Sequence, residues 1–480
     1  MKIISCIIII LFLLVISCKE SPDKPDILFI AIDDMNDWIT PLGGRENMHT
    51  PNIDALAGRG MLFENAHCTA PACCPSRTSV MTGVRPSTSG IYANTQIWRH
   101  STVLEKALTI PEFFREQGYT VRGGGKIFHA LSWIQTAYGI DQNDFTVWDE
   151  YYPSMSRSIP PSIWPESYEI DSLGTVYWEN IAGRETEGRP SYFFDWGPLG
   201  KEEDMADNKV VDWAISKLKE KYDKPLFLAV GIYRPHIPWF VPEEYFDLYP
   251  VEERDLPAIL ENDLDDVSPA SYRWVRRNWQ KWMIENEQWK YAVQAYEASI
   301  SFSDAMLGKL IRGLDESGRA DNTIIVLWSD HGMHIGEKEQ WEKFTLWEES
   351  TRVPLIIIVP GLTKAGSRSV EAVSLLDIYP TLVRLAGKKK FDQLEGTDLL
   401  PLIKDPDSKR DEPAITTFHK DNHSVRTERW RYIRYFNGDE ELYDHKNDPD
   451  EYYNLADSVD LKPIIEELSK WLPEINVNEL

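Results

Sequence analysis

Four short stretches of the chain are almost continuously apolar, and polar or turn-forming residues follow each of them. A strand that is buried on both faces has this pattern, whereas a strand with one solvated face alternates. Segments with helical periodicity lie between these runs. This order predicts an α/β protein with a largely parallel sheet, whose functional site lies at the carboxyl ends of the strands. The apolar runs are residues 25–32, 224–231, 323–328 and 353–359, and the helical segments are residues 52–60, 110–117, 205–219, 291–314 and 375–385.

The pattern changes near residues 405–407, which read Asp-Pro-Asp. Beyond this point the sequence predicts a small antiparallel sheet and a closing helix. We therefore expect a catalytic domain over residues 25–405 and a C-terminal subdomain over residues 406–480. Residues 150–165 are rich in Pro, Ser and Tyr and are expected to form a long surface loop. The short strands are expected at residues 414–418, 423–427 and 431–435, and the helix at residues 461–471.

The first 18 residues have the features of an export signal. Lys2 supplies a positive charge, a short apolar run follows, and Ser17 precedes Cys18, where polar sequence begins. The run is too short to span a membrane comfortably. Its end resembles a bacterial lipoprotein cleavage box, which predicts a signal peptide over residues 1–17, lipidation of Cys18 and a linker over residues 18–24. The protein would then be exported and membrane-anchored, in the periplasm or on the cell surface. Ordinary signal cleavage nearby is the alternative.

Composition restricts the partners. The 480-residue chain has 77 Asp and Glu residues against 51 Lys and Arg residues, a formal charge of −26. Such a chain is not expected to bind nucleic acid, and it needs a local basic pocket to attract an anionic substrate. Once Cys6 leaves with the signal, Cys68, Cys73 and Cys74 remain near one another in the sequence. Three clustered thiols do not make a disulfide scaffold, so we expect that one of them is kept for chemistry.

Two of the apolar runs end in acidic residues. Asp33 and Asp34 follow the first run, and Asp330 and His331 follow the third. Because the carboxyl ends of parallel strands lie side by side, these side chains can converge on one hard cation, which would relieve the repulsion between the carboxylates. Capping of a helix or turn is the alternative role of the Asp pair, and imidazole is an unusual ligand for calcium.

One cysteine is followed by proline two residues on and by arginine four residues on, at Cys73, Pro75 and Arg77. This pattern resembles the signature of the type I sulfatases. The resemblance implies that a separate maturation enzyme oxidises Cys73 to formylglycine, whose hydrated aldehyde is the nucleophile. Most relatives do not have a second cysteine at the next position. A pattern started at Cys74 would place proline directly after it, so the register selects Cys73.

Further motifs of the same family follow in order, and the best match is its iduronate-2-sulfatase-like branch. The resemblance covers nearly the whole mature chain. It implies the alkaline-phosphatase-like sulfatase fold, a large mixed, mostly parallel sheet sandwiched by helices, with a small C-terminal antiparallel-sheet subdomain. The motifs are residues 50–54, 83–86, 125–129, 234–238, 329–332, 341–343 and 441–444, with Asp448-Pro449 downstream.

The resemblance also implies roles for residues in these motifs. One calcium ion would be held by Asp33, Asp34, Asp330, His331 and the formylglycine at position 73. The cations that balance charge on the sulfate oxygens would be Arg77, Lys126 and Lys343. His129 would support the hydrate as a general base, and His236 would protonate the leaving oxygen or bind sulfate.

Residues that bind the rest of the substrate are less clearly marked. Trp98 and Arg99 stand where that branch has a Trp-Arg pair, and Arg99 is a candidate ligand of a uronate carboxylate. Pairing of Arg99 with one of the many acidic side chains is an equal alternative. His423 and Arg426 are candidates at the edge of the small sheet. Residues 273–289 are aromatic and basic, which suits a polyanionic sugar chain, although helical spacing favours packing in the core.

The leading hypothesis is a lipid-anchored sulfatase that acts on sulfated carbohydrates, namely oligosaccharides from glycosaminoglycans or from algal polysaccharides of the ulvan type. A phosphatase or phosphonate monoester hydrolase of the same superfamily is the second hypothesis, which the scarcity of His residues near the proposed site disfavours. A non-catalytic glycan-binding lipoprotein is the third. The presence of every expected catalytic residue argues against a decayed site.

Overall fold

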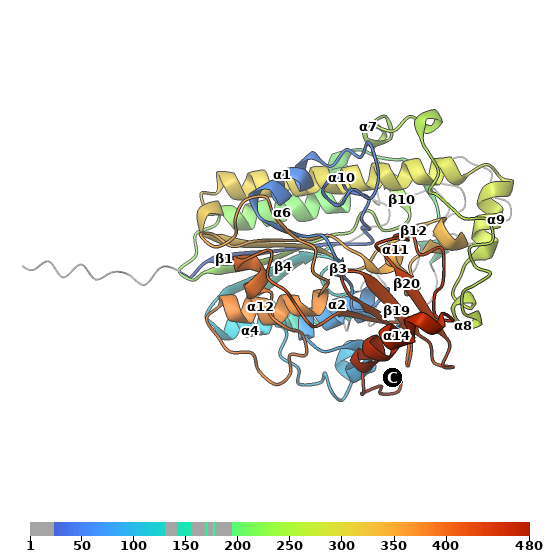
Figure 1. Ribbon diagram of the computed structural model, residues 1–480. Helices are drawn as coiled ribbons and strands as arrows, with labels where there is room; N and C mark the ends of the chain where they lie inside the picture. Colours follow the sequence, from blue (N-terminus) through green and yellow to red (C-terminus); the bar gives the residue numbers. More distant parts are fainter. Residues whose placement is uncertain (1–23, 130–141, 155–168, 171–175, 178–193) are drawn as a thin grey trace, which may run out of the picture.

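The computed structural model describes residues 24–129, 142–154, 169–170, 176–177 and 194–480 (Figure 1). Its centre is an eight-stranded sheet in the order β15-β2-β14-β11-β1-β9-β4-β5. The strand β1 lies in the middle and pairs in parallel with β9 and β11. The strands are β1 (Asp26–Ile32), β2 (Met61–Phe63), β4 (Thr120–Gly125), β5 (Glu150–Pro153), β9 (Leu226–Ile232), β11 (Thr323–Ser329), β14 (Leu355–Ile358) and β15 (Ser367–Ser369).

The predicted mixed, mostly parallel sheet is confirmed, with two local corrections. The apolar run at residues 353–359 forms β14, which is antiparallel to both of its neighbours, β11 and β2. The start of the predicted loop at residues 150–165 is the edge strand β5, which pairs in parallel with β4. Residues 155–165 of that predicted loop lie outside the described residues.

Helices cover both faces of this sheet (Figure 1). The alternation of β1 side chains explains why its sequence is apolar throughout. Leu28, Ile30 and Ile32 join one buried cluster, while Ile27, Phe29 and Ala31 join the other. One face carries α1 (Pro51–Arg59), α6 (Ala206–Lys219) and α10 (Trp289–Glu316), and the other carries α2 (Cys73–Thr82), α4 (Ile110–Glu116) and α12 (Ile378–Leu385).

The predicted C-terminal sheet is confirmed as four antiparallel strands. It contains β17 (Ala414–Thr417), β18 (His423–Arg426), β19 (Trp430–Arg434) and β20 (Glu440–Asp444), and α14 (Lys462–Leu468) packs near it. Buried ion pairs join this sheet to α11 (Glu348–Thr351). Arg431 on β19 pairs with Glu348, and Arg426 Nε donates to the same carboxylate at 3.1 Å.

Shorter elements complete the described part of the chain, in which no helix is both long and apolar enough to cross a membrane. The strands are β3 (Ala66–His67), β6 (Glu169–Ile170), β7 (Val176–Tyr177), β8 (Trp196–Pro198), β10 (Trp239–Val241), β12 (His334–Ile335), β13 (Trp341–Glu342) and β16 (Val373–Ser374). The helices are α3 (Pro86–Ser89), α7 (Glu243–Phe246), α8 (Pro269–Tyr272), α9 (Arg277–Glu285) and α13 (Leu400–Lys404).

A glycine at the end of β4 controls the position of Lys126. Gly125 has φ +80°, and a Cβ atom there would overlap the carbonyl oxygen of Gly231 on the neighbouring strand β9. Gly125→Ala is therefore expected to lower the free energy of unfolding by about 3 kcal/mol or more, the sum of left-handed strain and overpacking. Urea denaturation measures this.

Gly118→Ala is the matched control, because Gly118 has φ +86° and a Cβ atom there would meet nothing within 4 Å. That variant should lose only about 1 kcal/mol, the cost of the left-handed backbone. Equal losses in the two variants would mean that the close approach of β4 and β9 does not restrict position 125.

Candidate active site

The acidic residues at the ends of β1 and β11 meet, as the sequence predicts. Asp33, Asp34, Asp330 and His331 are all fully buried. The backbone N–H of Asp34 donates to Asp330 Oδ1 at 3.1 Å, and Asp34 adopts a left-handed conformation with φ 59°. Such a conformation is uncommon for a residue other than glycine and marks a turn held in place by its surroundings. The two strand ends therefore form one carboxylate cluster.

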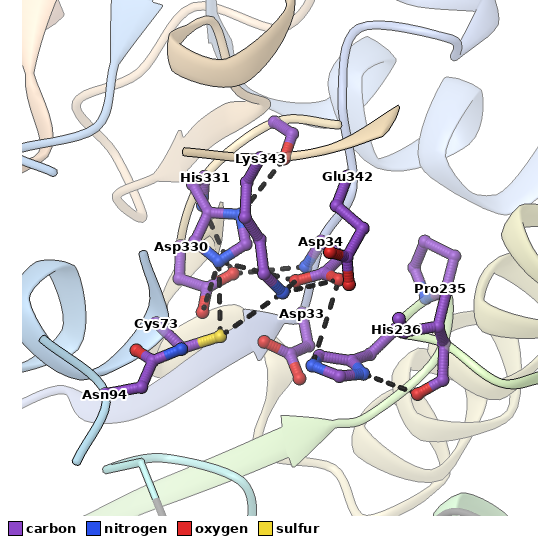
Figure 2. A network of polar contacts seen from close by, with 12 residues as sticks. Asp33, Asp34, Cys73, Asn94, Pro235, His236, Asp330, His331, Glu342 and Lys343 are labelled. Carbon is purple, nitrogen blue, oxygen red and sulfur yellow. Dashed lines mark hydrogen bonds and ion pairs between the residues drawn. The ribbon is translucent and has the colours of Figure 1, made fainter. Parts of the chain in front are cut away.

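Cys73 is the first residue of α2, and its side chain points into this cluster (Figure 2). The Sγ atom lies 3.2 Å from His331 Nε2, 3.5 Å from Lys126 Nζ and 3.6 Å from Lys343 Nζ. Burial raises the pKa of the Cys73 thiol, but Lys126, Lys343 and His331 outweigh it and hold the pKa well below its usual range. Position 73 is thus built to carry negative charge.

Cys74 has a different environment. Its Sγ atom lies 3.5 Å from the carbonyl oxygen of Gln96 and 3.9 Å from Thr78 Oγ1. Burial raises the pKa of its thiol to about 12, so Cys74 stays protonated. These surroundings agree with the sequence register in favouring Cys73 as the reactive position.

Three basic side chains surround the carboxylates. Lys126 pairs with Asp33, and Lys343 Nζ lies 2.7 Å from Asp34 Oδ1. Both ammonium groups also contact Cys73 and so face the position of the nucleophile. Arg77 differs, because its Nε donates to Asp330 at 2.6 Å and its guanidinium also contacts Asp33 and two backbone carbonyls. Arg77 therefore positions the carboxylates rather than presenting free donors to a sulfate group.

His236 stands at the outer side of the cluster, with its Nε2 atom 3.9 Å from Asp34 Oδ2 (Figure 2). Its Nδ1 atom lies 2.6 Å from the carbonyl oxygen of Ile237 and 2.9 Å from the hydroxyl of Tyr233. A carbonyl oxygen can only accept, so Nδ1 carries a hydrogen and the exchangeable proton belongs to Nε2. Tyr233 does not stand out in the sequence, since a tyrosine at the end of an apolar run looks like a core residue.

His129, the other predicted general base, is buried at the end of a described segment. The His129 side chain also contributes to the lowered pKa of Cys73, so it lies near the thiol. The structure thus brings together all ten residues that the sequence assigned to catalysis and metal binding, which are Asp33, Asp34, Cys73, Arg77, Lys126, His129, His236, Asp330, His331 and Lys343.

The donor atoms of this cluster suit a cation. One oxygen each of Asp33 and Asp330, Cys73 Sγ and a nitrogen of His331 all lie within 4.8 Å of one another. His331 Nδ1 faces the carbonyl oxygen of Gly332 at 3.0 Å, so Nε2 points toward the cluster. Burial lowers the pKa of His331, but Asp330 and Cys73 raise it to about 9, so Nε2 carries a proton that a bound cation would replace. Burial raises the pKa of Asp330 to about 7 despite Arg77, and the charge of Asp33 adds to this effect. A divalent cation would favour the ionised form of Asp330.

Two predicted substrate residues, Trp98 and Arg99, have structural partners. Trp98 is buried, stacks on Phe128 at a centroid distance of 5.1 Å and donates to the carbonyl oxygen of Gln142. Arg99 Nε donates to Asp144 at 2.8 Å, and its Nη2 atom contacts Glu112 at 3.1 Å. Arg99 thus has the acidic partners that the alternative interpretation expected.

The other two predicted substrate residues lie on β18. His423 is buried against Thr417, and burial lowers its pKa to about 4. Arg426 is engaged by Glu348 of α11. Among the described residues, no hydrogen bond or ion pair joins Trp98, Arg99, His423 or Arg426 to the side chains around Cys73. Their substrate roles remain predictions.

A buried nucleophile position flanked by two ammonium groups, a carboxylate cluster and an imidazole defines a hydrolase of anionic esters. A family model described as sulfatase matches residues 25–388, and a model described as the C-terminal part of N-sulphoglucosamine sulphohydrolase matches residues 336–478. The chain belongs to the sulfatase family and is a sulfuric ester hydrolase.

Two curated relatives support this assignment. A sulfatase of Formosa agariphila is 38% identical over 467 residues, which cover 95% of this chain and 88% of that protein. Iduronate 2-sulfatase of Mus musculus is 32% identical over 407 residues, which cover 77% of this chain and 70% of that protein. The resemblance to the iduronate-2-sulfatase-like branch is therefore confirmed.

The fold alone would not have separated the leading hypothesis from the second one. A solved phosphonate monoester hydrolase of Agrobacterium radiobacter superposes with a TM-score of 0.70, with 94% of this chain and 95% of that chain covered. Its sequence identity to this chain is only 21%. The sulfatase assignment rests on the family model and on the relatives with higher identity.

Proposed function

We propose that the protein hydrolyses sulfate esters of sulfated carbohydrates, with formylglycine at position 73 and one calcium ion. The observation that carries this proposal is the placement of Cys73 Sγ between Lys126, Lys343 and His331, beside the carboxylates of Asp33 and Asp330. A relative named iduronate 2-sulfatase supports a sugar sulfate as the substrate class.

Each catalytic side chain of the site has a separate role in the reaction. Lys126 and Lys343 lie beside the nucleophile position, where their charges offset the negative charge that develops on the sulfate oxygens. A hydrated aldehyde at position 73 would supply one hydroxyl to attack sulfur and a second whose collapse releases sulfate. His129 takes up the proton of the attacking hydroxyl, and His236 Nε2 gives its proton to the leaving sugar oxygen. The His236 side chain is 18% exposed and so has access to a leaving group.

Calcium fits the hard oxygen donors of the cluster. Asp33, Asp34, Asp330 and His331 would hold it together with residue 73, and the ion would supply charge compensation at the nucleophile. Formylglycine requires a separate maturation enzyme as a partner. Unmodified Cys73 lacks the second hydroxyl that releases sulfate, so protein made without this enzyme should not turn over.

A pair of aryl esters tests the proposal against phosphonate hydrolysis. Protein coexpressed with a maturation enzyme should hydrolyse 4-nitrophenyl sulfate with a higher kcat/KM than 4-nitrophenyl phenylphosphonate. The matched nitrophenol leaving group makes the sulfuryl or phosphonyl centre the main difference between the two reactions. A higher kcat/KM for the phosphonate would favour the second hypothesis instead.

We also propose that lipidated Cys18 anchors the protein to a membrane, outside the cytoplasm. The placement of Ser17 and Cys18 directly after the apolar run supports this proposal. Cys18→Ser expressed in a bacterial host should move from the detergent phase to the aqueous phase of a Triton X-114 extraction, because the acyl chains are lost. Cys6→Ser is the matched control and should stay in the detergent phase. Unchanged partitioning of Cys18→Ser would exclude Cys18 as the anchor.

A further inference from the structure

A row of aromatic and basic side chains begins next to the active site. Lys343 Nζ lies 3.6 Å from Cys73 Sγ and 5.9 Å from the centroid of the Phe344 ring. Phe344 has φ 79°, and its backbone N–H donates to the carbonyl oxygen of Pro71. A bulky residue in this conformation is an outlier that its surroundings must hold in place. Phe344 thus links the nucleophile position to the surface beside it.

The row continues outward from Phe344 through ring and guanidinium contacts. Arg276 lies over Phe344 with its Cζ atom 5.5 Å from the ring centroid, and the centroid of the Phe418 ring lies 6.1 Å from that of Phe344. Trp274 contacts Phe418 at 4.8 Å and stacks on His419 at 4.5 Å with an interplanar angle of 12°. The row reaches well beyond the catalytic side chains.

Arg273 ends the row at the surface. It is exposed, and its Cζ atom lies 4.7 Å from the Trp274 ring centroid and 5.7 Å from the Phe436 ring centroid. Phe436 is 53% exposed, which is unusual for a large aromatic side chain beside a packed sheet. Together, Phe344, Arg276, Trp274, Arg273, His419 and Phe436 form what we call the Trp274 strip.

Two of the three basic groups of the strip have acidic partners in this protein, whose formal charge is −26. Glu342 pairs with Arg276 at 2.8 Å, and Glu479 faces His419 at 3.6 Å. Within the described part of the chain, no acidic side chain forms an ion pair with Arg273, so its guanidinium is open to an anionic ligand. Flat faces of sugar rings pack on aromatic rings, and arginine binds sulfate groups through paired donors.

We propose that the Trp274 strip binds the sugar units that follow the cleaved residue in a sulfated oligosaccharide. The proposal rests on the proposed function, because it places the sulfated sugar at Cys73. The rest of the oligosaccharide then runs from Phe344 toward Phe436. The sugar units pack against the half-buried Phe344 and Trp274 and the exposed Phe436, and a sulfate or carboxylate of the second or third unit meets Arg273. The protein therefore recognises the length of the oligosaccharide as well as the sulfate ester.

Calorimetry on protein that retains the Cys73 thiol separates binding from turnover. The probes are size-fractionated disaccharides and tetrasaccharides of heparin and of ulvan. In at least one pair the tetrasaccharide should bind about tenfold more tightly than the disaccharide, and Trp274→Ala and Arg273→Gln should each remove most of this gain. Arg273 is exposed, so Arg273→Gln tests the strip without disturbing the core.

Tyr453→Ala and Arg59→Gln are the matched controls, because both residues are exposed and lie outside the strip. They should retain the full length-dependent gain. Equal affinities for both sizes of each probe, or a gain that survives in both strip variants, would overturn the proposal. Length-dependent binding without sulfate release by matured protein would instead contradict the proposed function and leave the strip standing.

Discussion

Replacing Cys73 with alanine is expected to lower kcat/KM for sulfate ester hydrolysis by about 10⁴-fold or more, the scale seen when a covalent nucleophile is removed. Lys126 and Lys343 would still bind the sulfate group, since their charges do not depend on the thiol. Binding without attack leaves KM nearly intact and removes kcat. Initial rates on 4-nitrophenyl sulfate, with variants purified to the same folded fraction, measure the loss.

Cys74→Ala is the matched control, because Cys74 is buried in the same helix turn but contacts Thr78 and Gln96 instead of the lysines. It should retain most of the activity, with a loss below about tenfold. Peptide mass mapping of the matured wild-type protein should place the aldehyde at residue 73. An aldehyde at residue 74, or near wild-type activity of Cys73→Ala, would contradict the assigned nucleophile.

Asp33→Asn is expected to abolish calcium binding and to lower kcat/KM by about 10³-fold, because the charge that holds the ion is lost. The same change leaves the buried Lys126 and Arg77 with one carboxylate fewer. Breaking a buried ion pair on one side typically costs about 3–5 kcal/mol, so the free energy of unfolding should also fall. Calorimetric titration with calcium, urea denaturation and initial rates separate these three effects.

Asp315→Asn serves as the control for the loss of an ion pair. Asp315 pairs with Arg59 at 3.1 Å, and both side chains are more than a third exposed. The free energy of unfolding should change by less than about 1 kcal/mol in that variant, and calcium binding should not change. Activity of the wild-type protein that persists after chelation with verified removal of metal would show that the Asp33 cluster does not need an ion.

The convergence of the strand ends was predictable because each step rests on a general rule. The apolar run before Asp33 signals a strand buried on both faces, and the run before Asp330 signals another. Parallel strands then bring their carboxyl ends together. The direction of each strand was not predictable in the same way, since an apolar run has the same pattern in a parallel strand and in an antiparallel strand. The strand at residues 355–358 therefore proved antiparallel, and only its pairing with β11 and β2 reveals this.

The partners of the arginines could not be read from the sequence. Arg77 and Arg99 both stand in family motifs, yet each is engaged by acidic side chains far away in the sequence, such as Asp330 and Asp144. In a chain with 77 acidic residues, the choice of partner depends on tertiary contacts that no local pattern records. Tyr233 was missed for a similar reason, because only the fold places its hydroxyl against His236.

If a modified Cys73 cleaves sulfate esters of sugars, the protein must release inorganic sulfate from them. Matured protein should be incubated with a set of sulfated disaccharides of defined position, with Cys73→Ala as the control, and free sulfate measured by ion chromatography. We expect stoichiometric sulfate from at least one disaccharide and none above background with the variant. Absence of sulfate from every sugar despite full conversion of Cys73 to the aldehyde, or equal release by the variant, would contradict this role of Cys73.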